Sequence, residues 1–182
     1  MEDIIIWIVF FILALVVVIY AIYNLAKGYA NKIEQEENII NKGKEYNAIY
    51  SGKFWHICGL SLAENSECIL HLGEEKIVIE SKSNIYNLHL NKILDMNIKD
   101  SKEVQNSISG AVGGALLFGP IGAFLGGTST ELHRFFIIIY RNKNNEEKCI
   151  SFDMKDNLES LKHIYRYIEN YNKHKEKRKI DL

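Results

Sequence analysis

The stretch CISFDMKDNLESLKHIYRYI, residues 149–168, changes from a β-strand pattern to an α-helix pattern. Its first residues favour a strand over 148–152. Asp156, with Glu159 three positions later, is typical of a helix N-cap and its capping-box partner. Apolar residues then recur at intervals of three and four, and these are Leu158, Leu161, Ile164, Tyr165, Ile168 and Tyr171. This spacing predicts one apolar helix face, which we expect to close the open end of a sheet or small barrel.

Short strand patterns precede this stretch. Residues 68–72 and 76–80 flank a Gly-Glu-Glu turn and predict a hairpin. An alternating run at 85–90 and an apolar run at 93–99 follow after brief polar breaks. Beyond a glycine-rich segment, residues 132–140 are strongly β-prone. Six or seven short strands with tight turns predict a mainly β (α+β) fold, either a sandwich or a partly open barrel of antiparallel strands capped by the C-terminal helix.

This order of strands and helix resembles the pleckstrin-homology (PH) superfold, in particular its bacterial PH-like and GRAM-like branches. The resemblance covers residues 50–172 and is carried by IYNLHLNKILDMNIKD (85–100) and by the stretch quoted first. It implies a module that binds lipid head groups, peptides or proteins, or that acts as a scaffold. The basic loop with which many PH domains hold inositol phosphates has no counterpart, because residues 60–67 contain Glu64 and Glu67 and no basic residue.

An apolar segment near the N-terminus predicts a membrane anchor. Residues 4–23 read IIIWIVFFILALVVVIYAIY without a charge, and twenty residues span roughly 30 Å as a helix. The acidic start and the lack of an Ala-x-Ala site favour an uncleaved anchor over a cleaved signal peptide. A buried core helix is less consistent with a segment that is apolar on every face. The anchor covers residues 1–26, and its membrane-facing residues include Ile4, Trp7, Phe11, Leu15, Tyr20 and Tyr23.

Charges outside the anchor predict its orientation. Lys27 and Lys32 follow the apolar segment and no basic residue precedes it, so we expect the N-terminus outside and the C-terminal domain in the cytoplasm.

Residues 27–49 form a polar helical stalk that frays near Gly43, and residues 173–182 form a basic tail. Three irregularly spaced cysteines suggest reduced thiols. A net charge of −1 gives no support for nucleic-acid binding.

Residues 107–130 form a segment rich in small residues that interrupts the strands. Seven of the twelve glycines and the only proline lie between 110 and 127. Spacing of four residues brings small side chains onto one helix face, where another backbone can approach closely. We expect a helical hairpin that contacts the membrane, mediates self-association, or packs on its own domain. The residues involved are Gly110, Ala111, Gly114, Ala115, Gly119, Pro120, Gly122, Ala123, Gly126 and Gly127.

No pattern of catalytic, metal-binding or nucleotide-binding residues stands out. The histidines and cysteines lack zinc-site spacing, and GAVGGALLFGP does not match a dinucleotide or P-loop motif. Histidines alternating with apolar residues in strands are expected on the solvent side, and the cysteines in the core. No cofactor or metal is predicted. The leading hypothesis is a non-enzymatic, single-pass membrane protein with a cytoplasmic binding or scaffolding module; the alternative is a glycine-zipper oligomer that perturbs or permeates membranes.

Overall fold

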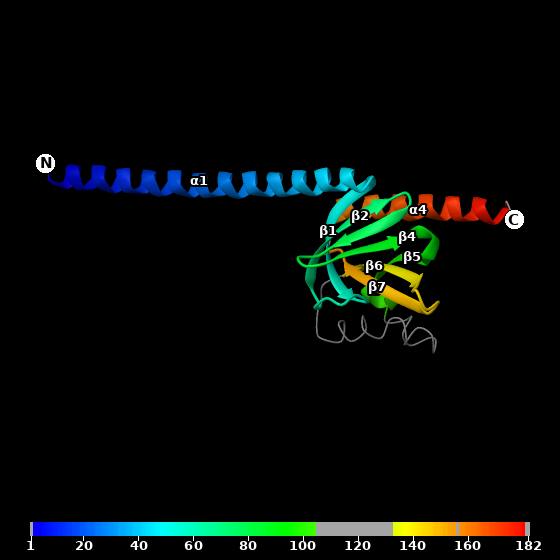
Figure 1. Cartoon of the computed structure of the whole chain (residues 1–182). Helices are drawn as coiled ribbons and strands as arrows, with labels where there is room; N and C mark the ends of the chain where they lie inside the picture. The colour runs from blue at the N-terminus through cyan, green and yellow to red at the C-terminus, as the bar shows by residue number, and fades with distance from the viewer. Residues whose placement is uncertain (1, 105–132, 156, 181–182) are drawn as a thin grey trace. The chain divides into compact units, whose positions relative to one another are not determined.

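The computed structural model describes residues 2–104, 133–155 and 157–180 (Figure 1). The chain divides into two compact units, residues 1–42 and 43–182. The first unit belongs to helix α1 (Glu2–Glu45), so the predicted anchor and stalk are one continuous helix that does not fray near Gly43. The predicted small-residue segment, from Gly110 to Gly127, lies outside the described residues.

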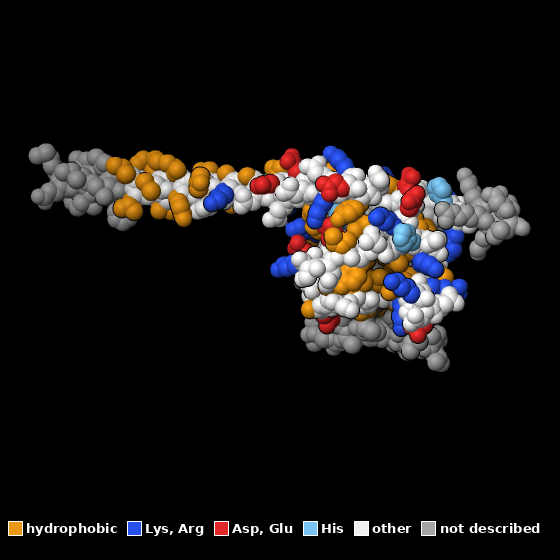
Figure 2. All heavy atoms as spheres, in the orientation of Figure 1, with side chains coloured by type: hydrophobic (Ala, Val, Ile, Leu, Met, Phe, Trp, Pro, Cys, Tyr) orange, Lys and Arg blue, Asp and Glu red, His pale blue; other side chains and the backbone are white. Residues whose placement is uncertain are grey.

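Helix α1 is long and apolar enough to cross a membrane. Its apolar side chains from Phe11 to Ile33 are exposed, and Trp7 and Tyr20 are 75% and 66% exposed. Phe11, Leu15 and Tyr23 are exposed as well, and Ile4 lies in the first turns of the same helix. Figure 2 shows this apolar surface giving way to charged side chains farther along the helix. Exposed apolar residues on every side of a helix are unfavourable in water and are accommodated by lipid.

The second unit contains a seven-stranded, open, antiparallel sheet and a C-terminal helix. The sheet order is β4-β3-β2-β1-β7-β6-β5. Two meanders, β1 to β4 and β5 to β7, are therefore joined where β1 pairs with β7, and β4 and β5 form the two edges. The elements are β1 (Ala48–Cys58), β2 (Ser66–Gly73), β3 (Lys76–Glu80), β4 (Ile85–His89), the 3₁₀ helix η1 (Leu90–Lys92), β5 (Ile93–Asp100), β6 (Arg134–Arg141), β7 (Glu147–Asp153) and α4 (Leu158–Ile180).

The main core lies between the concave face of the sheet and helix α4. Phe54, Phe136 and Phe152 are fully buried there, together with aliphatic residues from strands β2 to β7. Burial of each phenylalanine stabilises the fold by about 1.5–3 kcal/mol. The six or seven strands and the closing helix expected from the sequence are confirmed. Strand β1 begins at Ala48, three residues after the end of α1.

The buried face of α4 differs in detail from the predicted one. Ile164 and Tyr167 are buried, and Leu161, Ile168 and Tyr171 pack against them. Leu158 and Tyr165, which the spacing placed on this face, are 64% and 54% exposed. Leu158 and Tyr165 face away from Tyr167, because at about 100° per residue they lie about 180° and about 160° from it around the helix.

The helix also begins one residue later than expected. Asn157 caps it, since its Oδ1 accepts the backbone N–H of Ser160 at 3.0 Å and its carbonyl accepts that of Leu161. Asparagine is among the preferred N-cap residues, and this bond satisfies a donor that the first turn otherwise leaves unpaired. The predicted cap, Asp156, lies outside the described residues.

Candidate functional site

A cavity of about 580 Å³ lies where α4 crosses the gap between the two sheet edges. Its walls come from four segments that are far apart in the sequence: the start of β1, the β2–β3 turn, the η1 connection between β4 and β5, and the C-terminal half of α4. The lining residues are Ile49, Gly73, Glu74, Glu75, Leu90, Asn91, Ile93, Tyr167, Asn170, Tyr171, His174 and Lys175. A cavity of this size accommodates a small molecule or a few residues of a peptide.

Three side chains of α4 hold the cavity walls together. The Tyr167 hydroxyl donates to the carbonyl of Gly73 at 2.7 Å, and the Tyr171 hydroxyl donates to that of Ile93 at 2.7 Å. Lys175 Nζ donates to the carbonyl of Leu94. The three residues are spaced by four, so they form one stripe along the helix. Because these bonds join α4 to the end of β2 and the start of β5, the stripe fixes the helix across the gap.

The lining carries both signs of charge. Glu74 and Glu75 lie in the β2–β3 turn, and His174 and Lys175 lie on α4. Amide groups and the apolar side chains of Leu90 and Ile93 separate these charges. A polyphosphate would meet two carboxylates in such a cavity, which is unfavourable. A polypeptide segment, which carries amides, apolar groups and charges of either sign, matches the lining better.

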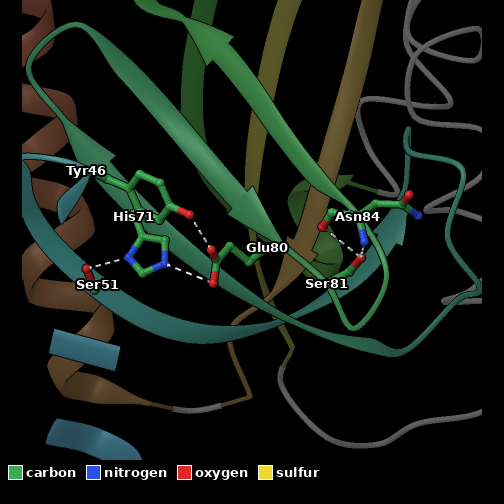
Figure 3. Close-up of polar contacts among 6 residues, drawn as sticks. All are labelled: Tyr46, Ser51, His71, Glu80, Ser81 and Asn84. Atoms are coloured by element: carbon green, nitrogen blue, oxygen red, sulfur yellow. Dashed lines mark hydrogen bonds and ion pairs between the residues drawn. The ribbon is translucent and has the colours of Figure 1, made fainter. Parts of the chain in front are cut away.

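A second polar arrangement lies within the sheet (Figure 3). We call it the His71 network, and it contains Tyr46, Ser51, His71 and Glu80. Ser51 Oγ lies 2.8 Å from His71 Nδ1, and His71 Nε2 lies 3.6 Å from Glu80 Oε2. The Tyr46 hydroxyl donates to Glu80 Oε1 at 2.6 Å, which raises the pKa of Tyr46. Both His71 and Glu80 are buried, so their polar groups would be costly in the interior without partners. Ser51 and Tyr46 supply hydrogen bonds, whereas His71 Nε2 meets Glu80 only as an ion pair at 3.6 Å.

The neighbouring turn closes beside the network. Ser81 and Asn84, at the β3–β4 turn in Figure 3, exchange hydrogen bonds of 2.9–3.1 Å through backbone and hydroxyl groups. This is a side-chain-capped turn of the kind that serine favours. It fixes the end of β3 directly after Glu80.

The order serine, histidine, carboxylate in the His71 network matches that of a hydrolase triad. The surroundings of Ser51 do not match one. A Cβ on Gly43 would lie 2.1 Å from Ser51 Oγ, so the backbone at the end of α1 covers the hydroxyl. None of the four network residues lines the cavity. We therefore interpret the network as a structural device that joins residues 43–51 to β2 and β3.

Two of the strand histidines are buried, contrary to the expectation that they face solvent. His71 is fully buried in the network, and His56 is 1% exposed. His89, on the edge strand β4, is exposed as expected. Cys68 and Cys149 are buried, in agreement with the prediction, and Cys58 is half-buried. Within the described residues, no group of three or more histidine, cysteine or acidic side chains is arranged to hold a metal ion.

His56 fixes the loop between β1 and β2 in its neutral form. Its Nε2 accepts the backbone N–H of Leu60 at 3.2 Å, so its Nδ1 carries the proton and lies 3.3 Å from the carbonyl of Ala63. Burial lowers the pKa of His56 below its usual 6.5. A histidine whose folded pKa is depressed stabilises the fold above the unfolded pKa, and this stabilisation is lost as the pH falls through the folded value.

We therefore expect acid to destabilise the domain partly through His56. The urea midpoint should fall between about pH 7.5 and about pH 5, and the fall should be smaller in His56→Gln, whose amide can replace both hydrogen bonds without titrating. His89→Gln, which changes an exposed histidine, serves as the control and should keep the wild-type slope. Equal slopes for wild type and His56→Gln would contradict the assignment.

The sequence analysis did not identify the cavity. None of its lining residues was singled out as a binding residue, and the proposed site residues from Gly110 to Gly127 lie outside the described part of the chain. The four-residue spacing of Tyr167, Tyr171 and Lys175 was the available signal, but Tyr167 was not assigned to the apolar face.

Comparison with known proteins adds no assignment. No protein-family model matches the chain, and no sequence among the curated proteins is similar to it.

Proposed function

We propose that this chain is a membrane-anchored, non-enzymatic binding module with a PH-like domain in the cytoplasm. Support for the anchor comes from the length of α1 and from the exposed apolar residues that it carries between Phe11 and Tyr23. Support for the PH-like assignment comes from the order of the elements, in which two meanders meet at β1 and β7 and a C-terminal helix covers the open side. The lysines that follow the anchor favour a cytoplasmic domain.

The observation that carries the binding role is the cavity between the sheet edges and α4. Its mixed charge and its amide and apolar lining favour a polypeptide segment of a partner protein as the ligand. Among the described residues, the nearby edge strands β4 and β5 each pair with one neighbouring strand, and an extended peptide could pair with the other side. The small-residue segment from Gly110 to Gly127 has a separate proposed role in membrane contact or self-association, which rests on its spacing alone.

Site-specific photo-crosslinking of the full chain in membranes tests this proposal. A photoreactive residue in place of Asn91, which lines the cavity and is exposed, should capture a discrete polypeptide. The same residue in place of Asn84, which is exposed in the β3–β4 turn at the opposite end of β4 from Leu90, is the matched control and should not. Adding Asn170→Trp, which fills the cavity from α4, should reduce capture at position 91 by about tenfold, since roughly 1.4 kcal/mol of lost affinity is enough.

The mass of the captured product separates the outcomes. A foreign polypeptide whose capture depends on the open cavity supports the binding module. A second copy of this chain, lost when Gly119 and Ala123 are changed to leucine, would instead assign self-association to the small-residue segment. Equal capture from positions 91 and 84 would contradict a binding role for the cavity.

A further inference from the structure

The connection between the two meanders depends on a short seam between β1 and β7. The seam pairs Trp55 with Asp153, His56 with Phe152 and Cys58 with Ser151, and its register shifts between His56 and Cys58. A shift of this kind marks a bulge, which kinks a strand and redirects its side chains. The bulge therefore lies immediately before Cys58.

Two thiols meet at this bulge. Residues opposite each other in an antiparallel pair project to the same face, as do residues two apart along one strand. Cys58 opposite Ser151 therefore shares a face with Cys149, and both cysteines belong to the same apolar cluster. Their side chains are hydrogen-bonded to each other. The backbones are also close, because a Cβ on Gly59 would lie 2.0 Å from the carbonyl oxygen of Cys149.

The two thiols are not equivalent. Cys58 is half-buried, whereas Cys149 is buried. The hydrogen bond from the Cys149 thiol lowers the pKa of Cys58, and a hydrogen bond from the backbone N–H of Ser151 adds to this effect. The pKa of Cys149 is raised by its hydrogen bond with Cys58 and by burial. Beside them, the Ser151 hydroxyl is fully buried and has no hydrogen-bond partner among the described residues. A more acidic, more accessible thiol next to a buried one is the arrangement of an attacking and a resolving cysteine.

We propose that Cys58 and Cys149 form a redox-active dithiol that closes to a disulfide across the β1–β7 seam when it meets a low-molecular-weight disulfide. The Cys58 thiolate attacks one sulfur of that disulfide, whose S–S bond breaks and releases one thiolate. Cys149 then loses its proton and attacks the Cys58 sulfur, which displaces the second thiolate. The two cysteines are oxidised by two electrons, and the small disulfide is reduced to two thiols that carry the two protons.

Closure of this dithiol would change the seam itself. The S–S bond would covalently join β1, the first strand of the first meander, to β7, the last strand of the second meander. It would also close a long loop, which restricts the unfolded chain strongly. The oxidised domain is therefore the more rigid one. In a reducing cytoplasm the pair is open, and it closes under disulfide stress.

Oxidised glutathione is a suitable probe for the full chain, carrying Cys68→Ala so that the third cysteine does not react. We expect the mass of the protein to fall by two hydrogen atoms, and trypsin, cutting after Lys53, Lys76, Lys148 and Lys155, to release peptides 54–76 and 149–155 joined by a disulfide. The oxidised protein should unfold at a higher urea concentration than the reduced one, and dithiothreitol should reverse both changes.

Single substitutions assign the two roles. Cys149→Ala should accumulate a glutathione adduct at Cys58, and Cys58→Ala should leave Cys149 unmodified over the same time. The reduced variants should keep the Trp55 fluorescence of the parent, which shows that they are folded. A stable adduct at Cys58 when both cysteines are present, or modification of Cys149 in the absence of Cys58, would overturn the proposal. So would identical urea midpoints for the oxidised and reduced chains.

Discussion

Replacing His71 with alanine is expected to lower the free energy of unfolding by about 3–5 kcal/mol, which is the usual cost of removing one partner of a buried ionisable pair. Glu80 is only 5% exposed, and His71 Nε2 lies 3.6 Å from its Oε2. The substitution also removes a ring that packs on Tyr46, with ring centroids 5.0 Å apart, and leaves a void. Urea unfolding of the full chain in detergent, followed by Trp55 fluorescence in a Trp7→Phe background, measures the loss.

A second substitution separates the charge from the void. In His71→Ala/Glu80→Gln a neutral amide replaces the carboxylate, and the amide oxygen still accepts the hydrogen bond from the Tyr46 hydroxyl. Part of the lost stability should therefore be recovered. His89→Ala, on the exposed edge strand, is the control and should change stability by no more than about 0.5 kcal/mol. An equal loss in the single and double variants would contradict the dependence of the buried carboxylate on His71.

The strands and the closing helix could be predicted because their signals are local. Residues 76–80 and 93–99 are short apolar runs bounded by polar turns, and β3 (Lys76–Glu80) and β5 (Ile93–Asp100) match those runs to within a residue. The apolar spacing after residue 157 required a helix and a surface to cover it. These features depend on neighbouring residues alone, so a single sequence contains them.

The burial of His71 could not be predicted, because the residues that bury it are distant in sequence. In β2 it alternates with Leu70 and Leu72, which places it on the opposite face of the strand from those two core residues. That face is covered by Tyr46, whose ring packs on it, and by the chain around Gly43. Only the tertiary path of residues 43–51 shows that this face is not exposed to solvent.

The cavity was missed for the same reason. It forms where residues 73–75, 90–93 and 167–175 meet, and no one of these segments has a motif that indicates binding.

The length and polarity of the anchor could be predicted, since a membrane span is a local property of composition. The role of the segment from Gly110 to Gly127 stays a prediction.

Replacing Gly59 with alanine is expected to cost at least about 3 kcal/mol of unfolding free energy. Gly59 has φ +98°, a region that side chains other than glycine rarely adopt and that costs roughly 1–3 kcal/mol. The new Cβ would lie 2.0 Å from the carbonyl oxygen of Cys149 and 2.7 Å from the Cα of Ile150. Both are backbone atoms of β7, so the strands themselves must separate. Gly28→Ala is the control, because a Cβ there has nothing within 4 Å and favours the helix by about 0.5–1 kcal/mol.

The same substitution tests whether the β1–β7 seam and the dithiol depend on one close approach. Under reducing conditions Gly59→Ala should lower the urea midpoint without any contribution from sulfur chemistry. Under oxidised glutathione it should also slow the joining of peptides 54–76 and 149–155, because separated strands move Cys58 away from Cys149. A variant that keeps the wild-type midpoint would contradict the backbone contact. A destabilised variant that still forms the disulfide at the wild-type rate would show that the thiols meet independently of Gly59.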